Sequence, residues 1–124
     1  KKLDYYREIY QISSEARNIF CSKNDKNFLD DISKLLNESW RLKKSLSNNV
    51  TNNQIDEIYN AALKNGAMAG KILGAGGGGF IMFITKNSLD RKKLIKFLNK
   101  LIHVNFKFEN DGTKIISKTT YAYK

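Results

Sequence analysis

The sequence contains very little cysteine and histidine and lacks proline. Its 124 residues include one cysteine, Cys21, one histidine, His103, and no proline. A single cysteine excludes an internal disulfide framework and a cysteine-based metal cage, and it favours a reducing compartment, so we expect a cytoplasmic protein. No Ser/His/Asp or Cys/His catalytic set can be assembled convincingly around one histidine and one cysteine. The sequence therefore predicts no metal site and no catalytic set of this kind, and we interpret His103 as a residue at the start of a strand.

Long hydrophobic runs and acidic residues are also scarce. The longest uncharged stretch, residues 72–85, has 14 residues and five glycines, which is too short and too rich in glycine to span a bilayer. The chain has 12 Asp and Glu against 22 Lys and Arg, which gives a formal net charge of +10 and a pI near 9.7. A basic surface fits an anionic partner, but charge alone favours the interpretation that these lysines form a solvated face. We therefore expect no nucleic-acid partner and no membrane partner.

Helical periodicity dominates the first half of the chain. Apolar residues recur at spacings of three and four in the predicted helices 3–22 and 26–46. The stripe of the second helix consists of Phe28, Ile32, Leu35, Ser39, Leu42 and Leu46. A third helix is predicted over 52–65. Thr51 and Gln54 form a capping box at its start, and Val50 and Ile55 occupy the hydrophobic-staple positions. Asn65-Gly66 stops this helix, because glycine takes positive φ without a Cβ clash.

The second half changes to short apolar runs that indicate strands. Strands are predicted near 68–73 and 80–85, followed by a basic helix over 89–101 that Asn87 or Ser88 caps. The inward residues of that helix are Leu94, Ile95, Leu98 and Leu101. Alternating residues 104–108 and the segment 113–118, joined by a turn at Asn110-Asp111-Gly112, predict a further pair of strands. This order predicts an α+β domain with helices packed on a mostly antiparallel sheet.

The glycine-rich segment between the first two predicted strands is the main candidate for a binding site. It consists of Gly74, Ala75, Gly76, Gly77, Gly78 and Gly79. Each glycine loses more backbone entropy on folding than any other residue, so such a run disfavours folding unless bare backbone is needed there. Consecutive backbone N–H groups can form a nest that binds an anion. A glycine-rich hairpin without a ligand is the simpler alternative, but six residues are more than a hairpin turn requires.

Three common glycine motifs fit this segment poorly. The phosphate loop G-x-x-x-x-G-K-[ST] fails because Gly66 to Lys71 is one residue short and Ile72 replaces the hydroxyl residue. The dinucleotide fingerprint G-x-G-x-x-G is matched literally, but a strand follows it where a helix is needed. The aromatic strand of RNA-recognition modules is matched loosely by residues 79–83, but three predicted helices come first.

The segment does resemble a motif of one enzyme family. Residues 70–80 resemble the third conserved motif of the GHMP kinases, G-x-x-x-x-G-A-G-G-G-G-[CF]. Asn37-Glu38-Ser39-Trp40 resembles the segment that precedes this motif in the sugar-kinase branch, and within that branch the similarity is greatest to heptose 7-phosphate kinases. The resemblance covers almost the whole chain but only the C-terminal portion of such an enzyme. Because the sequence also begins at Lys1 rather than Met, we expect a part of a longer bacterial kinase.

The resemblance implies that two domains contribute different parts of the active site. It implies that this chain is a ferredoxin-like C-terminal domain, that its own N-terminal kinase domain is its partner, and that the active site lies between them. The nucleotide-phosphate loop and the catalytic base would belong to that N-terminal domain, so no catalytic residue is expected here and the chain alone should be inactive. The glycine-rich segment would line the cleft near the transferred phosphoryl group.

The resemblance also implies ligands. It implies ATP and Mg²⁺ as cofactors and a sugar phosphate as substrate, namely heptose 7-phosphate, phosphorylated at the anomeric hydroxyl. A kinase of galactose or fucose, and a non-catalytic RNA- or anion-binding module, are the alternatives. Four residues are possible contacts to substrate or to the other domain: Glu38, Ser39, Trp40 and Lys71. A solvated carboxylate, a packing tryptophan and a strand-edge lysine are the competing interpretations for Glu38, Trp40 and Lys71.

Overall fold

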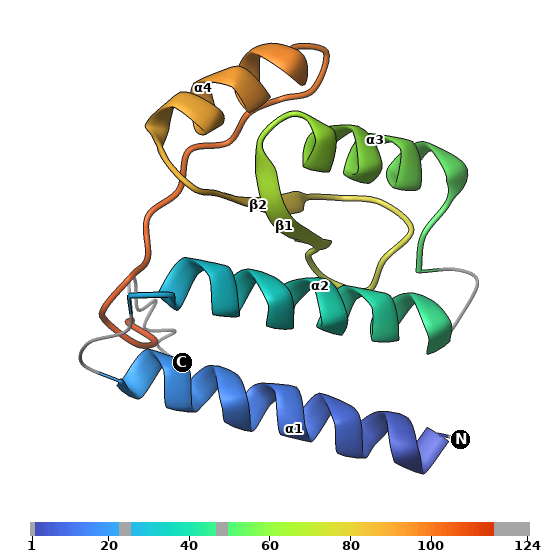
Figure 1. The fold of residues 1–124 in the computed structure, drawn as a ribbon, viewed down its shortest axis with the longest axis vertical. Helices are drawn as coiled ribbons and strands as arrows, with labels where there is room; N and C mark the ends of the chain where they lie inside the picture. Colours follow the sequence, from blue (N-terminus) through green and yellow to red (C-terminus); the bar gives the residue numbers. More distant parts are fainter. Residues whose placement is uncertain (1, 23–25, 47–49, 116–124) are drawn as a thin grey trace, which may run out of the picture.

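A computed structural model describes residues 2–22, 26–46 and 50–115 of the chain. These residues form four α-helices and two strands: α1 (Lys2–Cys21), α2 (Phe28–Leu46), α3 (Asn53–Lys64), β1 (Ala67–Ile72), β2 (Ile81–Thr85) and α4 (Ser88–Phe97). The two strands pair antiparallel, with Ile72 opposite Ile81 at the end next to the glycine-rich segment. Helices packed on an antiparallel sheet confirm the predicted α+β class (Figure 1).

Helix α2 lies between α1 and the sheet, so two of its sides are covered (Figure 1). On one side, the Phe28 ring meets the Phe20 ring of α1 at a centroid distance of 5.2 Å. On the other side, Asn37 bonds to β1 and the Trp40 ring lies 6.0 Å from that of Tyr59 in α3. The single stripe predicted from periodicity therefore describes only part of the buried surface of α2.

The core has two adjoining parts. The larger part contains Trp40, Val50, Ile55, Tyr59 and Ile72, and Trp40 and Ile72 are each only 1% exposed. The smaller part joins Ala62 and Ala67 to Leu94 of α4. The core thus connects α2, α3, α4 and β1. It supports the end of β1, where the glycine-rich segment begins.

The helix ends follow local signals with one correction. The predicted capping box of Thr51 and Gln54 is wrong. Asn52 caps α3 instead, because its backbone is extended (φ −143°, ψ 172°) and its Oδ1 accepts the Ile55 N–H at 2.9 Å. The Thr51 hydroxyl is buried and has no hydrogen-bond partner in the described part of the chain. Gly66 has φ +107°, as the predicted stop requires, and Asn87 caps α4.

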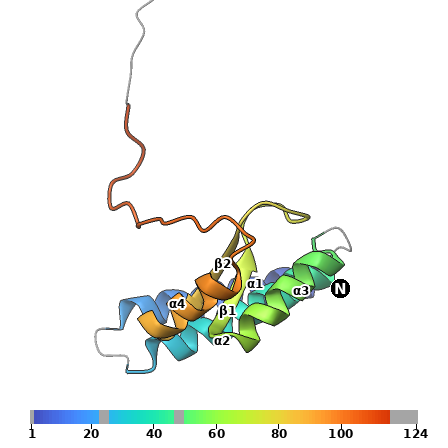
Figure 2. The ribbon, with the colours of Figure 1, turned by 90° about the horizontal axis from the view of Figure 1, so that it is seen from above.

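The strand predicted over 104–108 is not formed. Residues 102–115 are irregular and exposed and run away from the body of the domain (Figure 2). Phe108 is 88% exposed, and Leu101, predicted to face inward, is 44% exposed. The helix ends at Phe97, earlier than predicted, and alternation makes a strand only where a neighbouring strand supplies hydrogen bonds. The partner strand predicted over 113–118 is absent from residues 113–115, and residues 116–118 lie outside the described part.

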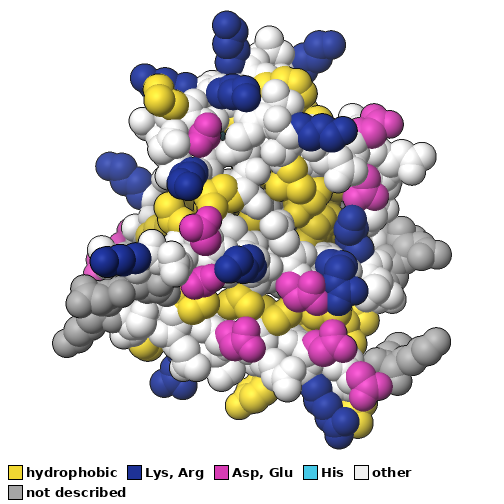
Figure 3. All heavy atoms as spheres, in the orientation of Figure 1, with side chains coloured by type: hydrophobic (Ala, Val, Ile, Leu, Met, Phe, Trp, Pro, Cys, Tyr) yellow, Lys and Arg dark blue, Asp and Glu magenta, His cyan; other side chains and the backbone are white. Residues whose placement is uncertain are grey.

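Charges are dispersed over the face shown in Figure 3. Lys and Arg side chains lie among Asp and Glu side chains there, rather than in one continuous patch. This distribution agrees with the interpretation of the lysines as a solvated surface. None of the helices in the described residues combines the length and the apolar character that a membrane crossing needs.

Candidate functional site

The glycine-rich segment forms a closed loop between β1 and β2. We call residues 73–80 the glycine loop. The Leu73 N–H donates to the Phe80 carbonyl at 2.9 Å and closes its base. Gly74, Gly76, Gly77 and Gly79 have φ values of +84°, +112°, +75° and +96°. Because L side chains rarely adopt this region, the loop path itself requires glycine.

The middle of the loop is attached to the chain just before α3. The Gly77 N–H donates to the Val50 carbonyl at 3.0 Å. A Cβ atom on Gly76 would lie 2.7 Å from the Val50 oxygen and 2.8 Å from the Val50 Cα. Gly76 is therefore required by close approach as well as by its φ angle. The sequence placed Val50 only in a hydrophobic staple, and it carries no local signal for this long-range contact.

The rest of the loop is open. A Cβ atom on Gly74, Gly78 or Gly79 would meet no other atom within 4 Å. The backbone of Gly78 and Gly79 is exposed, so a ligand can approach it without displacing protein atoms. The loop thus combines an attached centre with an accessible second half. This arrangement suits a ligand that contacts backbone, such as a phosphate group.

Two lysines lie at the entrance of the loop. The Lys43 Nζ, from the last turn of α2, donates to the Gly74 carbonyl. Lys71 is half-buried in β1, and its burial and then the charge of Lys43 lower its pKa. Lys71 was a predicted contact residue. Sequence reasoning missed Lys43, whose only signal is its place in the Leu42-Lys43-Lys44 run after the Asn37-Glu38-Ser39-Trp40 segment.

The other predicted contact residues do not join the loop through hydrogen bonds or ion pairs in the described residues. Glu38 pairs with Arg41 on the exposed side of α2, with Oε1 and Nη2 2.5 Å apart, and the hydrogen bond from Arg41 lowers the pKa of Glu38. Ser39 is half-buried. Trp40 lies in the core at 1% exposure, so its side chain packs inside this domain and is not available to a substrate or to another domain.

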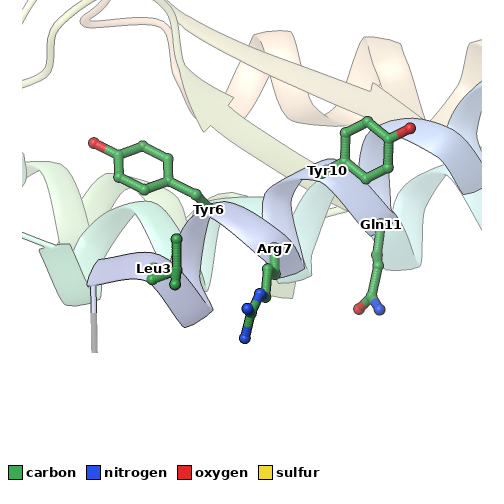
Figure 4. Close-up of a pocket in the computed structure, with 5 residues that line it drawn as sticks. All are labelled: Leu3, Tyr6, Arg7, Tyr10 and Gln11. Atoms are coloured by element: carbon green, nitrogen blue, oxygen red, sulfur yellow. The ribbon is translucent and has the colours of Figure 1, made fainter.

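Two hollows on the surface are lined by described residues outside the loop. A hollow of 410 Å³ runs along α1 and is lined by Leu3, Tyr6, Arg7, Tyr10 and Gln11 (Figure 4). A second, of 350 Å³, lies at the beginning of α2. The α1 hollow is a shallow stretch along one helix and does not enclose a ligand as small-molecule pockets do. The described residues also hold no group of three or more His, Cys, Asp or Glu side chains able to bind a metal ion.

Comparisons with known proteins identify the family of this chain. Residues 22–103 match the family model of the C-terminal domain of GHMP kinases, and this match covers more than half of the chain. The chain therefore belongs to the GHMP kinase family, as the resemblance of the loop predicted.

One relative of this chain is a heptose 7-phosphate kinase. The chain is 39% identical over 85 residues to the D-glycero-alpha-D-manno-heptose 7-phosphate kinase of Campylobacter jejuni subsp. jejuni serotype O:2. The aligned region is 67% of this chain and 25% of that kinase. The chain thus spans about a quarter of the length of this relative.

Proposed function

We propose that this chain is the C-terminal part of an ATP-dependent sugar kinase that phosphorylates heptose 7-phosphate at its anomeric hydroxyl. Membership in the GHMP kinases supports a sugar kinase, and the similarity to a heptose 7-phosphate kinase supports the acceptor. The observation that carries the proposal is the glycine loop, attached at Gly76 and Gly77 and open at Gly78 and Gly79. We also propose that the protein acts in the cytoplasm, where its N-terminal kinase domain completes the site.

The chemistry of phosphoryl transfer fits a loop of this kind. Transfer depends mainly on positioning the reacting groups and on stabilising charge on the phosphate oxygens. The open backbone of Gly78 and Gly79 and the ammonium of Lys71 are the groups here that would contact phosphates. When bound, ATP supplies the phosphoryl group and Mg²⁺ neutralises part of its charge. The catalytic base would come from the N-terminal kinase domain.

An acceptor screen tests the proposal. The full-length protein is assayed with ATP and Mg²⁺ on heptose 7-phosphate, galactose and fucose. We expect turnover of heptose 7-phosphate with kcat/KM at least about a hundredfold above that for either unphosphorylated sugar, a difference of about 2.7 kcal/mol. Preference for galactose or fucose would support a sugar kinase but would overturn heptose 7-phosphate as its acceptor. No phosphoryl transfer to any sugar would overturn the kinase itself.

A loop variant tests whether the loop takes part in catalysis. The sequence predicts that a bulkier residue at Gly77 lowers kcat more than stability, but Gly77 has φ +75° and bonds to Val50, so its replacement also strains the fold. Gly78 is the cleaner position, because its Cβ would point into open space. We expect Gly78→Ala in the full-length enzyme to lower kcat about tenfold or more at unchanged melting temperature. Unchanged kcat would favour a hairpin without a ligand.

The chain alone provides the complementary test. We expect its 124 residues to show little or no kinase activity, because the nucleotide loop and base belong elsewhere. Turnover comparable to that of the full-length protein would contradict the assignment of the active site to two domains.

A further inference from the structure

We infer that Lys43 and Lys71, together with the entrance of the glycine loop, form a binding site for a phosphate dianion. The inference deepens the proposed function and rests on it for the source of the phosphate, a substrate of the kinase. Its evidence comes from two elements that converge on one point and from a charge that the described protein leaves unbalanced.

Lys43 reaches the loop entrance because α2 packs along β1. The Asn37 Nδ2 of α2 donates to the Met68 carbonyl, near the beginning of β1, at 3.0 Å. Six residues further along both elements, the Lys43 Nζ donates to the Gly74 carbonyl, just beyond the end of β1. The helix and the strand therefore run in the same direction. The last turn of α2 consequently lies beside the loop entrance, with Lys43 held there by the Gly74 carbonyl.

The positive charges of Lys43 and Lys71 lack the kind of partner that the neighbouring Lys44 has. Lys44 pairs with Asp56 at 3.3 Å and lies over the rings of Trp40 and Tyr59, at 5.7 and 5.9 Å from their centroids. In the described part of the chain, neither Lys43 nor Lys71 forms an ion pair with a carboxylate. Lys71 is nevertheless half-buried in β1, two residues before the glycine loop begins, and its burial and then the charge of Lys43 lower its pKa. A dianion between them would supply the missing charge through charge-assisted hydrogen bonds.

A purely structural role makes a different prediction. If Lys43 only fastens the Gly74 carbonyl, then its removal loosens the loop but does not alter anion affinity beyond the effect of net charge. This explanation does not apply to Lys71, because no hydrogen bond of its ammonium is seen in the described residues. Affinity and stability therefore have to be measured separately.

The experiment titrates the chain with inorganic phosphate at constant ionic strength. Amide shifts of residues 74–79 are followed by NMR. The variants are Lys43→Gln, Lys71→Gln and, as a control with the same net charge, Lys93→Gln on the exposed side of α4. We expect each of the first two to weaken phosphate binding about tenfold and the control less than about twofold. Equal weakening by all three, or no saturable shift in the parent chain, would overturn the inference.

Charge rescue and stability complete the test. Lys71→Arg is expected to restore most of the affinity that Lys71→Gln loses, because it keeps the positive charge. Urea unfolding of each variant shows whether the fold persists. Loss of affinity in Lys71→Gln and Lys71→Arg alike, at unchanged stability, would overturn a site that depends on charge.

The source of the phosphate is distinguished in the full-length kinase. If Lys43 and Lys71 hold the phosphate of the acceptor, then Lys71→Gln raises the KM for the sugar phosphate and leaves the KM for ATP unchanged. If they hold a nucleotide phosphate, then the KM for ATP rises instead. Either result supports the site, and an unchanged KM for both overturns it as a substrate site. Phosphate binding by the chain, together with no kinase activity of the full-length protein, would overturn the proposed function and leave the anion site standing.

Discussion

The hydroxyl of Tyr59 donates a hydrogen bond to the Oδ1 of Asn37 at 2.6 Å, although the two residues lie 22 positions apart. Tyr59 is 7% exposed and belongs to α3, whereas Asn37 belongs to α2. The Asn37 Nδ2 in turn donates to the Met68 carbonyl of β1. One asparagine therefore joins α2 to both α3 and β1, and these are the elements that lead to the glycine loop.

Removal of the Tyr59 hydroxyl is expected to destabilise the domain. Tyr59→Phe leaves the half-buried Asn37 Oδ1 without this donor, so the free energy of unfolding in urea should fall by about 1–2 kcal/mol. Tyr10→Phe is the matched control, because Tyr10 is 76% exposed on α1. A similar loss in both variants would show that the bond to Asn37 contributes nothing specific.

Alkaline pH should weaken the fold through the same residue. Burial raises the pKa of Tyr59, and the backbone hydrogen bond with Gly70 acts in the opposite direction. The folded chain thus keeps a proton that the unfolded chain, with an ordinary pKa of about 10, begins to lose. The contribution of Tyr59 is full below pH 10 and declines as the pH rises through its folded-state pKa. Unfolding at about pH 9 and about pH 11 should show a smaller decline in Tyr59→Phe than in the parent; equal declines would contradict this.

The beginning of α3 offers a test between two adjacent capping residues. Asn52→Ala should cost about 1 kcal/mol of stability, because the Ile55 N–H loses its acceptor. Thr51→Val should cost little or nothing, since the Thr51 hydroxyl is buried without a partner in the described residues. Thermal unfolding of both variants measures the difference. A larger loss in Thr51→Val would restore the capping box that the sequence predicts.

The attached and open parts of the glycine loop should respond differently to alanine. Gly76→Ala combines φ +112° with a Cβ 2.7 Å from the Val50 oxygen, so we expect a loss of about 1–3 kcal/mol or a displaced loop. Gly78→Ala should change stability by less than about 0.5 kcal/mol, because nothing lies within 4 Å of its Cβ. Urea unfolding of the two variants measures the difference in stability. Equal losses would mean that Val50 does not hold the loop.

Features set by a few neighbouring residues could be predicted from the sequence. Gly66 stops α3 and Asn87 caps α4, because left-handed backbone and first-turn N–H groups have local chemical solutions. The glycine loop was also located correctly between two strands. Thr51 and Asn52 show the limit of such signals, since both residue types cap helices well and only the backbone angles of residue 52 settle the choice.

Features that depend on distant partners could not be predicted. Trp40 follows Ser39 directly and so lies one residue off the predicted stripe, but α2 is covered on two sides, and the second side needs contacts from α3 and β1. Val50 and Lys43 meet the loop across 27 and 31 positions, from Val50 to Gly77 and from Lys43 to Gly74. The alternation of Val104, Phe106 and Phe108 indicates a strand, yet no sheet edge receives these residues in the described structure.

The bond between Gly77 and Val50 makes the two halves of the glycine loop unequal in how they can evolve. From Leu73 to Gly77 the chain length is fixed, because an inserted residue would move Gly76 away from Val50 and Gly74 away from Lys43. Between Gly77 and Phe80 the loop can lengthen as long as the Phe80 carbonyl still reaches the Leu73 N–H, because a Cβ atom on Gly78 or Gly79 would meet nothing within 4 Å. Lineages that inherit this domain can therefore vary the second half of the loop in length, and in composition at Gly78, more readily than the first half, whereas Gly79 keeps its glycine because of its φ of +96°.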